Sequence, residues 1–200
     1  MNINHCPVCH RSASANGTGV RDTYVVDCSY CGHYEISGSA AGEADSLPNE
    51  KRALASAWLV HNRPDIFNAD HLRIAVATPQ PSLTVRALAG LRYLSRRFGQ
   101  GTRFRPDQVL DSEFGADCGF VPHSWSRSDA EAQYILSECL VQELKYVSQI
   151  DPFRELCITP KGWLALDGQV NRSSSVGFIA MWFNEHVSAL HEHSISPAIV

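Results

Sequence analysis

The spacing of hydrophobic residues along the chain changes from a strand pattern to a helix pattern. Residues 23–26 and 33–36 are rich in β-branched and aromatic side chains, which favours two short strands. Apolar residues then recur at helical spacing and predict one helix from Ser46 to about His61 and another from Ser82 to Phe98. Residues 37–46, which are mostly small and acidic, predict a linker before the first helix.

A helix, a hairpin and another helix are predicted after residue 127. Ser128-Asp129-Ala130-Glu131 is a capping box, and the apolar face that follows it extends this helix to residue 143. Residues 145–148 and 155–158 have the composition of strands, with a turn-forming Asp-Pro pair between them. Thr159 and Pro160 then have the positions of a cap and a first helical residue, so they predict the start of the last helix.

This order of elements resembles the winged-helix family over roughly residues 105–168, and Ile158-Thr159-Pro160-Lys161-Gly162 resembles the motif at the exit of its wing. Members of that family often bind DNA through the helix before the wing, here residues 128–143. This helix has no lysine or arginine and carries four carboxylates, those of Asp129, Glu131, Glu138 and Glu143. Because carboxylates repel DNA phosphates, we expect the winged helix to contact a protein partner or a second copy of the chain.

Four of the seven cysteines form two pairs near the N-terminus. Two residues separate Cys6 from Cys9 and Cys28 from Cys31, and 18 residues separate the pairs. This spacing predicts a four-thiolate zinc site, since each short turn aims two sulfurs at one tetrahedral metal. Such a site is structural, so residues 1–36 are expected to form a zinc ribbon. The alternatives are a disulfide pair or two unrelated reduced pairs; nothing at the N-terminus resembles the secretory signal that a disulfide framework requires.

Other residues with metal-binding or nucleophilic side chains have simpler interpretations. Four thiolates complete a zinc tetrahedron, so the neighbouring histidines are expected to be solvated: His5, His10 and His33. The isolated cysteines are expected to pack as small apolar residues: Cys118, Cys139 and Cys157. Cysteines at metal-binding spacing indicate a reducing cytoplasm. The longest apolar run, residues 178–183, is too short to cross a bilayer.

Charge is distributed unevenly although the formal net charge is only −4. This net charge gives no overall attraction to nucleic acid or to an anionic membrane. Residues 81–105 nevertheless contain six arginines and no acidic residue. They can be interpreted as a weak nucleic-acid site, with Arg92, Arg96 and Arg97 as candidates, but we favour a solvated face that pairs with the acidic residues 107–117.

The pattern changes once more near the C-terminus. Residues 168–175 are polar and serine-rich and predict a second linker. Residues 176–181 form an apolar run of strand length, as in a parallel strand that is buried on both faces. This run continues into Trp182-Phe183, and Ile195-x-Pro197-Ala198-Ile199 follows farther on. The whole stretch resembles the opening of nucleoside 2-deoxyribosyltransferase-like domains, which are related in shape to TIR domains.

That resemblance covers residues 176–200 and implies the first βα unit of a Rossmann-like domain that cleaves N-glycosidic bonds of nucleosides, nucleotides or NAD. It implies a nucleoside-pocket loop at Met181, Trp182 and Phe183. The catalytic glutamate of the family lies beyond Val200, so no residue of this chain inherits that role. A single βα unit cannot bury a two-faced apolar strand, and the chain is therefore expected to be truncated.

These patterns together predict an α+β protein with a zinc ribbon at 1–36, a helical segment and winged helix at 46–168, and an incomplete α/β domain at 176–200. The predicted function is a zinc-binding sensing or assembly module at the front of a nucleoside- or NAD-processing bacterial effector, as in phage defence. The chain is not expected to be catalytic by itself, and a nucleotide ligand is expected only if the C-terminal domain is complete. The alternatives are a DNA-binding regulator, and an N-glycosidic-bond hydrolase in a chain that continues beyond Val200.

Overall fold

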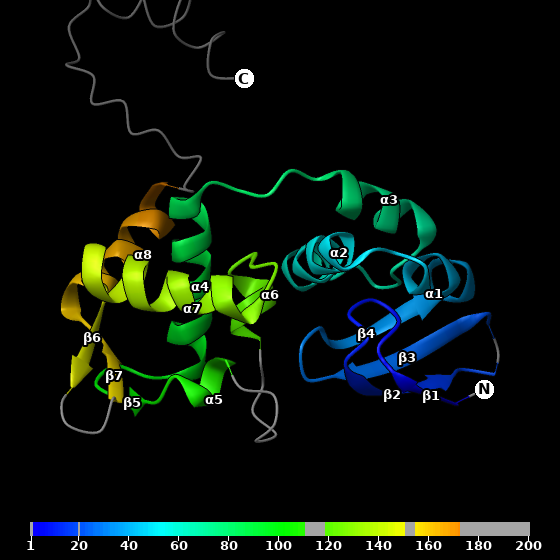
Figure 1. Cartoon of the computed structure of the whole chain (residues 1–200), viewed down its shortest axis with the longest axis horizontal. Helices are drawn as coiled ribbons and strands as arrows, with labels where there is room; N and C mark the ends of the chain where they lie inside the picture. Colours follow the sequence, from blue (N-terminus) through cyan, green and yellow to red (C-terminus); the bar gives the residue numbers. More distant parts are fainter. Residues whose placement is uncertain (1, 20, 111–118, 151–154, 173–200) are drawn as a thin grey trace, which may run out of the picture. The chain divides into compact units, whose positions relative to one another are not determined.

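The computed structural model describes residues 2–19, 21–110, 119–150 and 155–172, and it contains both helices and sheets (Figure 1). The first sheet is antiparallel, with its strands in the order β1-β2-β3-β4. These strands are β1 Asn2–His5, β2 Ser12–Gly17, β3 Thr23–Cys28 and β4 Gly32–Ser37. The two strands predicted at 23–26 and 33–36 are therefore confirmed, each slightly longer than expected.

Strands β1 and β2 have no counterpart among the predicted elements. β2 begins Ser12-Ala13-Ser14-Ala15, and such small residues have little intrinsic strand preference. Pairing with β3 makes this segment a strand, since Ala13 lies opposite Cys28 and Asn16 lies opposite Val25. The strand thus depends on contacts that are distant in sequence, which a local pattern does not reveal.

A helix occupies the segment that was predicted to be a linker. α1 spans Gly38–Asp45, and the hydroxyl of Ser37 caps it by accepting a hydrogen bond of 3.2 Å from the N–H of Ala40. The linker prediction for 37–46 is wrong because its alanines lie at helical spacing and are buried: Ala40, Ala41 and Ala44. Small side chains allow this helix to pack closely without a conspicuous apolar pattern.

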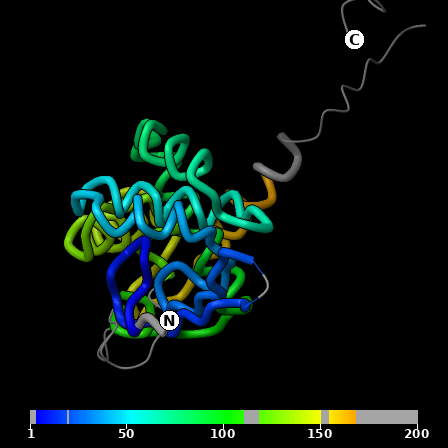
Figure 2. Tube along the Cα trace, turned by 90° about the vertical axis from the view of Figure 1, so that its right-hand side faces the viewer, coloured from blue at the N-terminus to red at the C-terminus, as the bar shows by residue number. Residues whose placement is uncertain are grey.

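Two more helices come next in the chain. α2 spans Asn49–Asn62, which confirms the first predicted helix, and it ends at Arg63 in the left-handed conformation with φ of 43°. Figure 2 shows α2, in cyan, beside the blue trace of the first sheet. α3 spans Ala69–Ala77 and was not predicted. Its capping box joins Asn68 to His71, with a histidine where a glutamate or glutamine would have been recognised.

The second sheet has three strands in the order β5-β7-β6, and helices precede and follow it. α4 spans Leu83–Arg97 and confirms the helix predicted from Ser82 to Phe98. The short elements β5 Arg103–Phe104, α5 Asp107–Leu110 and α6 Phe120–His123 come next. The hairpin predicted after residue 143 is present, with strands β6 Val147–Ile150 and β7 Glu155–Ile158.

The helix predicted at 128–143 is present in two forms. α7 spans Asp129–Tyr134 and begins with the serine half of the predicted capping box, since the Ser128 hydroxyl accepts from the N–H of Glu131 at 3.2 Å. The carboxylate of Glu131 accepts from the N–H of Arg127, one residue before the position expected of a capping box. The remainder is a π-helix, η1, that spans Ile135–Glu143. It ends with a hydrogen bond of 2.8 Å from the N–H of Leu144 to the carbonyl of Cys139, five residues back. A π-helix of this length is rare and often marks a functional region.

α8 spans Pro160–Arg172, so the predicted start of the last helix is confirmed. The helix continues through residues 168–172, and the predicted linker therefore begins too early; most of these residues have ordinary helix propensity. Met1–Asp167 forms one compact unit, and Gly168 begins a second unit. Of the second unit only the end of α8 is described, and the βα unit predicted at 176–200 lies outside the described residues.

Candidate metal centre

Two tight turns place the four cysteines at the same end of the first sheet. In the turn between β1 and β2, the N–H of Cys6 donates to the carbonyl of Arg11 and the N–H of His10 donates to the carbonyl of Cys6, both at 2.8 Å. In the turn between β3 and β4, Cys28 lies opposite Gly32, which has a φ of 82°. Glycine adopts this conformation without strain, so it suits the residue after the second pair.

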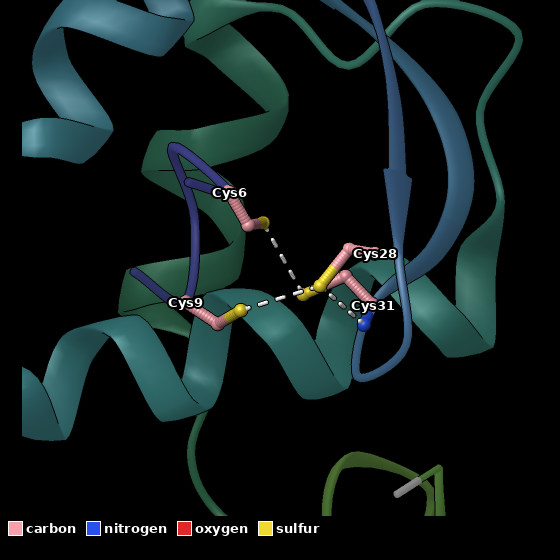
Figure 3. Close-up of side chains that lie close together, drawn as sticks. All are labelled: Cys6, Cys9, Cys28 and Cys31. Carbon is pink, nitrogen blue, oxygen red and sulfur yellow. Dashed lines mark hydrogen bonds between the residues drawn. The ribbon is translucent and has the colours of Figure 1, made fainter. Parts of the chain in front are cut away.

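The four sulfur atoms point toward one another (Figure 3). Sγ of Cys6 lies 3.8 Å from Sγ of Cys31, and Sγ of Cys9 lies 3.5 Å from Sγ of Cys28. All four sulfurs lie within 4.8 Å of one another. A tetrahedral ion with metal–sulfur bonds of about 2.3 Å separates its ligands by about 3.8 Å, whereas a disulfide requires about 2.05 Å. The cluster therefore fits one metal ion and contains no disulfide.

Two hydroxyl groups contact the cluster from neighbouring elements. Oη of Tyr34 lies 2.9 Å from Sγ of Cys6, and Oγ of Ser56 lies 3.5 Å from Sγ of Cys31. Burial raises the pKa of Tyr34 well above its usual value, and the nearby Cys6 and Cys31 raise it further. The phenol therefore remains protonated and can donate to a metal-bound sulfur, as groups around a metal's direct ligands commonly do.

The pKa values of two of the thiols, those of Cys6 and Cys31, shift in opposite directions. Interaction with the thiols of Cys28 and Cys31 lowers the pKa of Cys6, whereas burial raises the pKa of Cys31. Four neighbouring thiols cannot all ionise in a buried site, because like charges repel one another there. A cation removes this repulsion and coordinates the thiolate form, so metal binding and release of the thiol protons are coupled.

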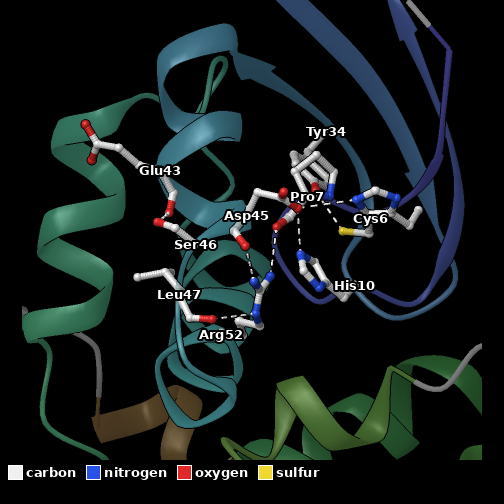
Figure 4. Close-up of polar contacts among 10 residues, drawn as sticks. Cys6, Pro7, His10, Tyr34, Glu43, Asp45, Ser46, Leu47 and Arg52 are labelled. Atoms are coloured by element: carbon white, nitrogen blue, oxygen red, sulfur yellow. Dashed lines mark hydrogen bonds and ion pairs between the residues drawn. The ribbon is translucent and has the colours of Figure 1, made fainter.

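Arg52 on α2 connects the first cysteine turn to the helices. Its guanidinium donates to the carbonyl of Leu47 at 2.8 Å, to that of Pro7 at 3.3 Å and to that of Asp45 (Figure 4). Ser56 lies one helical turn later, and both side chains are buried. Sequence analysis did not identify either residue, since an arginine in a helix usually indicates an exposed face.

The histidines beside the cysteines are exposed, but each has a carboxylate partner. His5 and His10 both approach Asp45, which is the last residue of α1. Nδ1 of His33 lies 2.6 Å from Oδ1 of Asp27 in the neighbouring strand. The first two histidines and Asp45 form a second group with the composition of a metal site.

The arginines of residues 81–105 do not act as one group. Arg86 is buried, and its Nη2 lies 2.7 Å from Oε1 of Glu131. Arg105 pairs with Asp107 at 3.1 Å, which is the kind of pairing that was expected for this segment. The three candidate nucleic-acid residues are exposed on the second half of α4: Arg92, Arg96 and Arg97.

Several carboxylates of the helix over residues 129–143 have partners within the protein. Oδ1 of Asp129 accepts a hydrogen bond of 2.9 Å from Arg11, and Glu131 pairs with Arg86. The side chain of Gln142 donates to Glu138 at 3.3 Å. The pairing of Asp129 and Glu131 with arginines reduces the repulsion that the sequence alone suggests.

The other predicted site residues are placed as follows. Cys139 is buried on η1 and Cys157 is half-buried on β7, as expected of packing residues. Two of the predicted groups lie outside the described part of the chain: Cys118, and the predicted pocket loop Met181, Trp182 and Phe183. Among the described helices, none has the length and apolar character needed to span a membrane.

Comparison with models of protein families, with curated proteins and with solved structures gives no match.

Proposed function

We propose that the chain is a zinc-stabilised sensing or assembly module without catalytic activity of its own. The observation that carries this proposal is the converging set of four sulfurs from Cys6, Cys9, Cys28 and Cys31. Four thiolates complete the tetrahedral coordination of zinc and leave no position for water or substrate. Zinc bound there contributes folding free energy by joining the β1–β2 turn to the β3–β4 turn.

The donor set favours zinc over ions that prefer oxygen ligands or square-planar geometry. Magnesium, calcium and manganese prefer oxygen ligands, and copper(II) and nickel(II) favour square-planar or tetragonal sites. A compact tetrahedral group of thiolates is typical of zinc or iron. Two paired cysteine turns at the end of a small antiparallel sheet support the zinc-ribbon interpretation of residues 1–36, with α1 and α2 packed beside it.

The order of elements from Leu83 onward supports a winged-helix interpretation of the second part. A helix, a short strand, further helices and a hairpin follow in that order, and β7 lies between β5 and β6. In this interpretation the hairpin is the wing, and α7 with η1 is the helix that precedes it. The carboxylates of this helix favour a protein partner or self-association as its role over tight DNA binding.

The resemblance of residues 176–200 to nucleoside 2-deoxyribosyltransferase-like domains extends the proposal. On this resemblance the proposal is that the module stands at the front of a bacterial effector, of the kind used in phage defence, that processes nucleosides or NAD. In this arrangement the module senses a signal or assembles the complex, and a following domain carries out the chemistry.

The zinc site is tested by measuring metal content and metal–ligand distances. Protein purified under reducing conditions is expected to contain about one equivalent of zinc, with X-ray absorption at the zinc edge showing four sulfur ligands near 2.3 Å. Cys28→Ser is expected to lose the zinc, whereas the control Cys157→Ser, a half-buried cysteine of β7, retains it. Reduced protein without metal, or Cys28→Ser protein with a full equivalent of zinc, would refute the site.

The absence of catalysis is tested separately. Incubation of the purified chain with NAD and with nucleosides is expected to release no free base. Release that is proportional to protein concentration and persists through further purification would show that the chain is an enzyme, and the module interpretation would be abandoned.

A further inference from the structure

A second cluster of metal-ligating side chains lies beside the first cysteine pair. His5 immediately precedes Cys6, His10 immediately follows Cys9, and both imidazoles meet the carboxylate of Asp45. Nε2 of His10 lies 2.7 Å from Oδ1 of Asp45, and Nε2 of His5 lies 3.3 Å from the same oxygen. The three ligand atoms lie within 4.8 Å of one another.

Each of the three side chains is positioned by a different part of the fold. His5 is the last residue of β1, and Asp45 is the last residue of α1, with its carbonyl held by Arg52. His10 closes the cysteine turn with φ of 60°, a left-handed conformation that is uncommon for a residue with a side chain. Figure 4 shows the ring of His10 directed toward Asp45. The cluster therefore depends on the fold, since Asp45 lies 35 residues after His10 in the sequence.

The cluster differs from the simple histidine–carboxylate pair that His33 forms. That residue has one carboxylate partner, Asp27, at 2.6 Å, which is a simple pair on the same sheet. In the cluster, two imidazoles converge on one carboxylate oxygen. Two neutral nitrogens and one anionic oxygen are the donor set of three-ligand zinc sites, and imidazole also suits nickel and copper.

The dimensions of the cluster are close to those that a metal requires. Bonds of about 2.1 Å in a tetrahedral site separate the ligand atoms by about 3.4 Å. The spacings of 2.7 Å and 3.3 Å to the shared oxygen need only small side-chain rotations to reach this value. Exposed side chains can make such rotations, and here between 42% and 56% of each side chain is exposed.

We propose that His5, His10 and Asp45 form a second metal site, which binds an exchangeable divalent transition ion. Three protein ligands leave at least one position for water, and solvent exposure allows the ion to leave, in contrast to an ion held by the four sulfurs. Mixed nitrogen and oxygen ligands exclude a preference for magnesium or calcium, which take oxygen ligands. An ion in this site ties the cysteine turn to the end of α1. The proposal rests on the proposed function only in that a bound zinc orders the turn that carries both histidines.

The test is a calorimetric titration of zinc-loaded protein with Ni²⁺. Wild-type protein is expected to bind one Ni²⁺ per chain while it retains its zinc. His10→Ala and Asp45→Asn are each expected to weaken this binding by more than about 100-fold, since loss of an outer partner alone costs 10- to 100-fold. Ni²⁺ is also expected to raise the melting temperature of the wild type but not of these variants.

His33→Ala is the matched control, because the chain contains nine histidines and surface histidines bind nickel weakly. This variant removes an exposed, carboxylate-paired histidine of the same sheet and is expected to bind Ni²⁺ as the wild type does. Zinc content, measured on every variant, shows that the sheet is intact when it stays at one equivalent. Absence of Ni²⁺ binding in the wild type, or equal binding in His10→Ala, overturns the second site. Purified protein without zinc refutes the four-sulfur site instead, and Ni²⁺ titration of that zinc-free protein, compared between wild type and His10→Ala, then decides the second one.

Discussion

Nη2 of Arg86 lies 2.7 Å from Oε1 of Glu131, so an ion pair joins α4 to α7. Only 8% of the Arg86 side chain and 27% of the Glu131 side chain is exposed. Glu131 also accepts a hydrogen bond of 2.6 Å from the backbone N–H of Arg127, so one carboxylate both holds the chain just before the cap Ser128 and neutralises the arginine. The pair thus fixes α7 to α4, although β5, α5 and α6 lie between these two helices in the sequence.

Glu131→Gln is expected to destabilise the protein, because glutamine keeps an acceptor for the N–H of Arg127 but leaves the charge of Arg86 buried without its carboxylate partner. Breaking a buried pair in this way costs about 3–5 kcal/mol, and partial exposure of Glu131 places the expected value near the lower end. The free energy of unfolding in urea measures it. Glu138→Gln on η1 serves as the control, because this half-buried carboxylate contacts the neutral Gln142 and not an arginine, and it is expected to change stability by less than about 0.5 kcal/mol.

The same pair gives a pH dependence of defined sign. Burial would raise the pKa of Glu131, but the N–H of Arg127 and the guanidinium of Arg86 outweigh it and lower this pKa overall. The stabilisation is therefore present above the unfolded-state pKa of about 4.3 and is lost as the pH falls through the lower folded-state value. The stability difference between wild type and Glu131→Gln is expected to shrink over this range. A difference that stays constant with pH would contradict the assigned ion pair.

Tyr34→Phe is expected to weaken metal binding without unfolding the sheet. The substitution removes the hydroxyl that lies 2.9 Å from Sγ of Cys6 and keeps the buried ring. Loss of such an outer hydrogen bond reduces metal affinity by about 10- to 100-fold, measured by competition with a chromogenic chelator. Tyr24→Phe, in the half of β3 remote from the cysteines, is expected to leave the affinity unchanged. Equal affinity of Tyr34→Phe and wild type would show that the phenol does not act on the ligand.

Two glycines of α8 are expected to respond in opposite ways to alanine. A Cβ atom at Gly162 would overlap the carbonyl oxygen of Tyr146 and lie 3.0 Å from Cγ2 of Ile158. Gly162→Ala is therefore expected to destabilise the protein by about 1–3 kcal/mol. At Gly168 a Cβ atom meets none of the described atoms within 4 Å, so Gly168→Ala is expected to stabilise by about 0.5–1 kcal/mol through helix propensity. Thermal unfolding of both variants measures the contrast.

DNA binding, if it is detected, is expected to be weak and independent of sequence. The exposed arginines of α4 can bind phosphates, and removal of each such arginine should reduce the slope of log affinity against log salt by about one unit. The variants Arg92→Ala, Arg96→Ala and Arg97→Ala are compared with Arg73→Ala, an exposed arginine of α3 that pairs with Asp70 at 2.7 Å. Tight binding to one DNA sequence at moderate salt would favour a DNA-binding regulator.

The sequence predicted the four-cysteine cluster because its members occur as two local pairs, and each pair needs only one turn to be correctly placed. The surroundings of the cluster were not predictable in this way. Ser56 lies 25 residues after Cys31, and Asp45 lies 35 residues after His10, so their contacts depend on how α1 and α2 pack. Periodicity contains no information on these distances.

Some elements escaped prediction for reasons of local chemistry. α1 relies on buried alanines, and α3 begins with an unusual histidine capping box. The π-helix could not be distinguished from an α-helix, because Ile135, Leu136, Cys139 and Leu140 have a spacing that fits the start of either form. What decides between them is the pairing of backbone groups, such as the bond from Leu144 to Cys139.

Arg52 also determines where the chain can be divided. A peptide that ends at residue 36 retains all four cysteines but loses the guanidinium that holds the carbonyl of Pro7 and the hydroxyl beside Cys31. Such a peptide carries the four cysteines without the side chains of α2 that contact their turns. A fragment that preserves the surroundings of the cluster therefore extends through α2, to Asn62, and expression limits drawn from the cysteine spacing alone would separate the cysteines from these side chains.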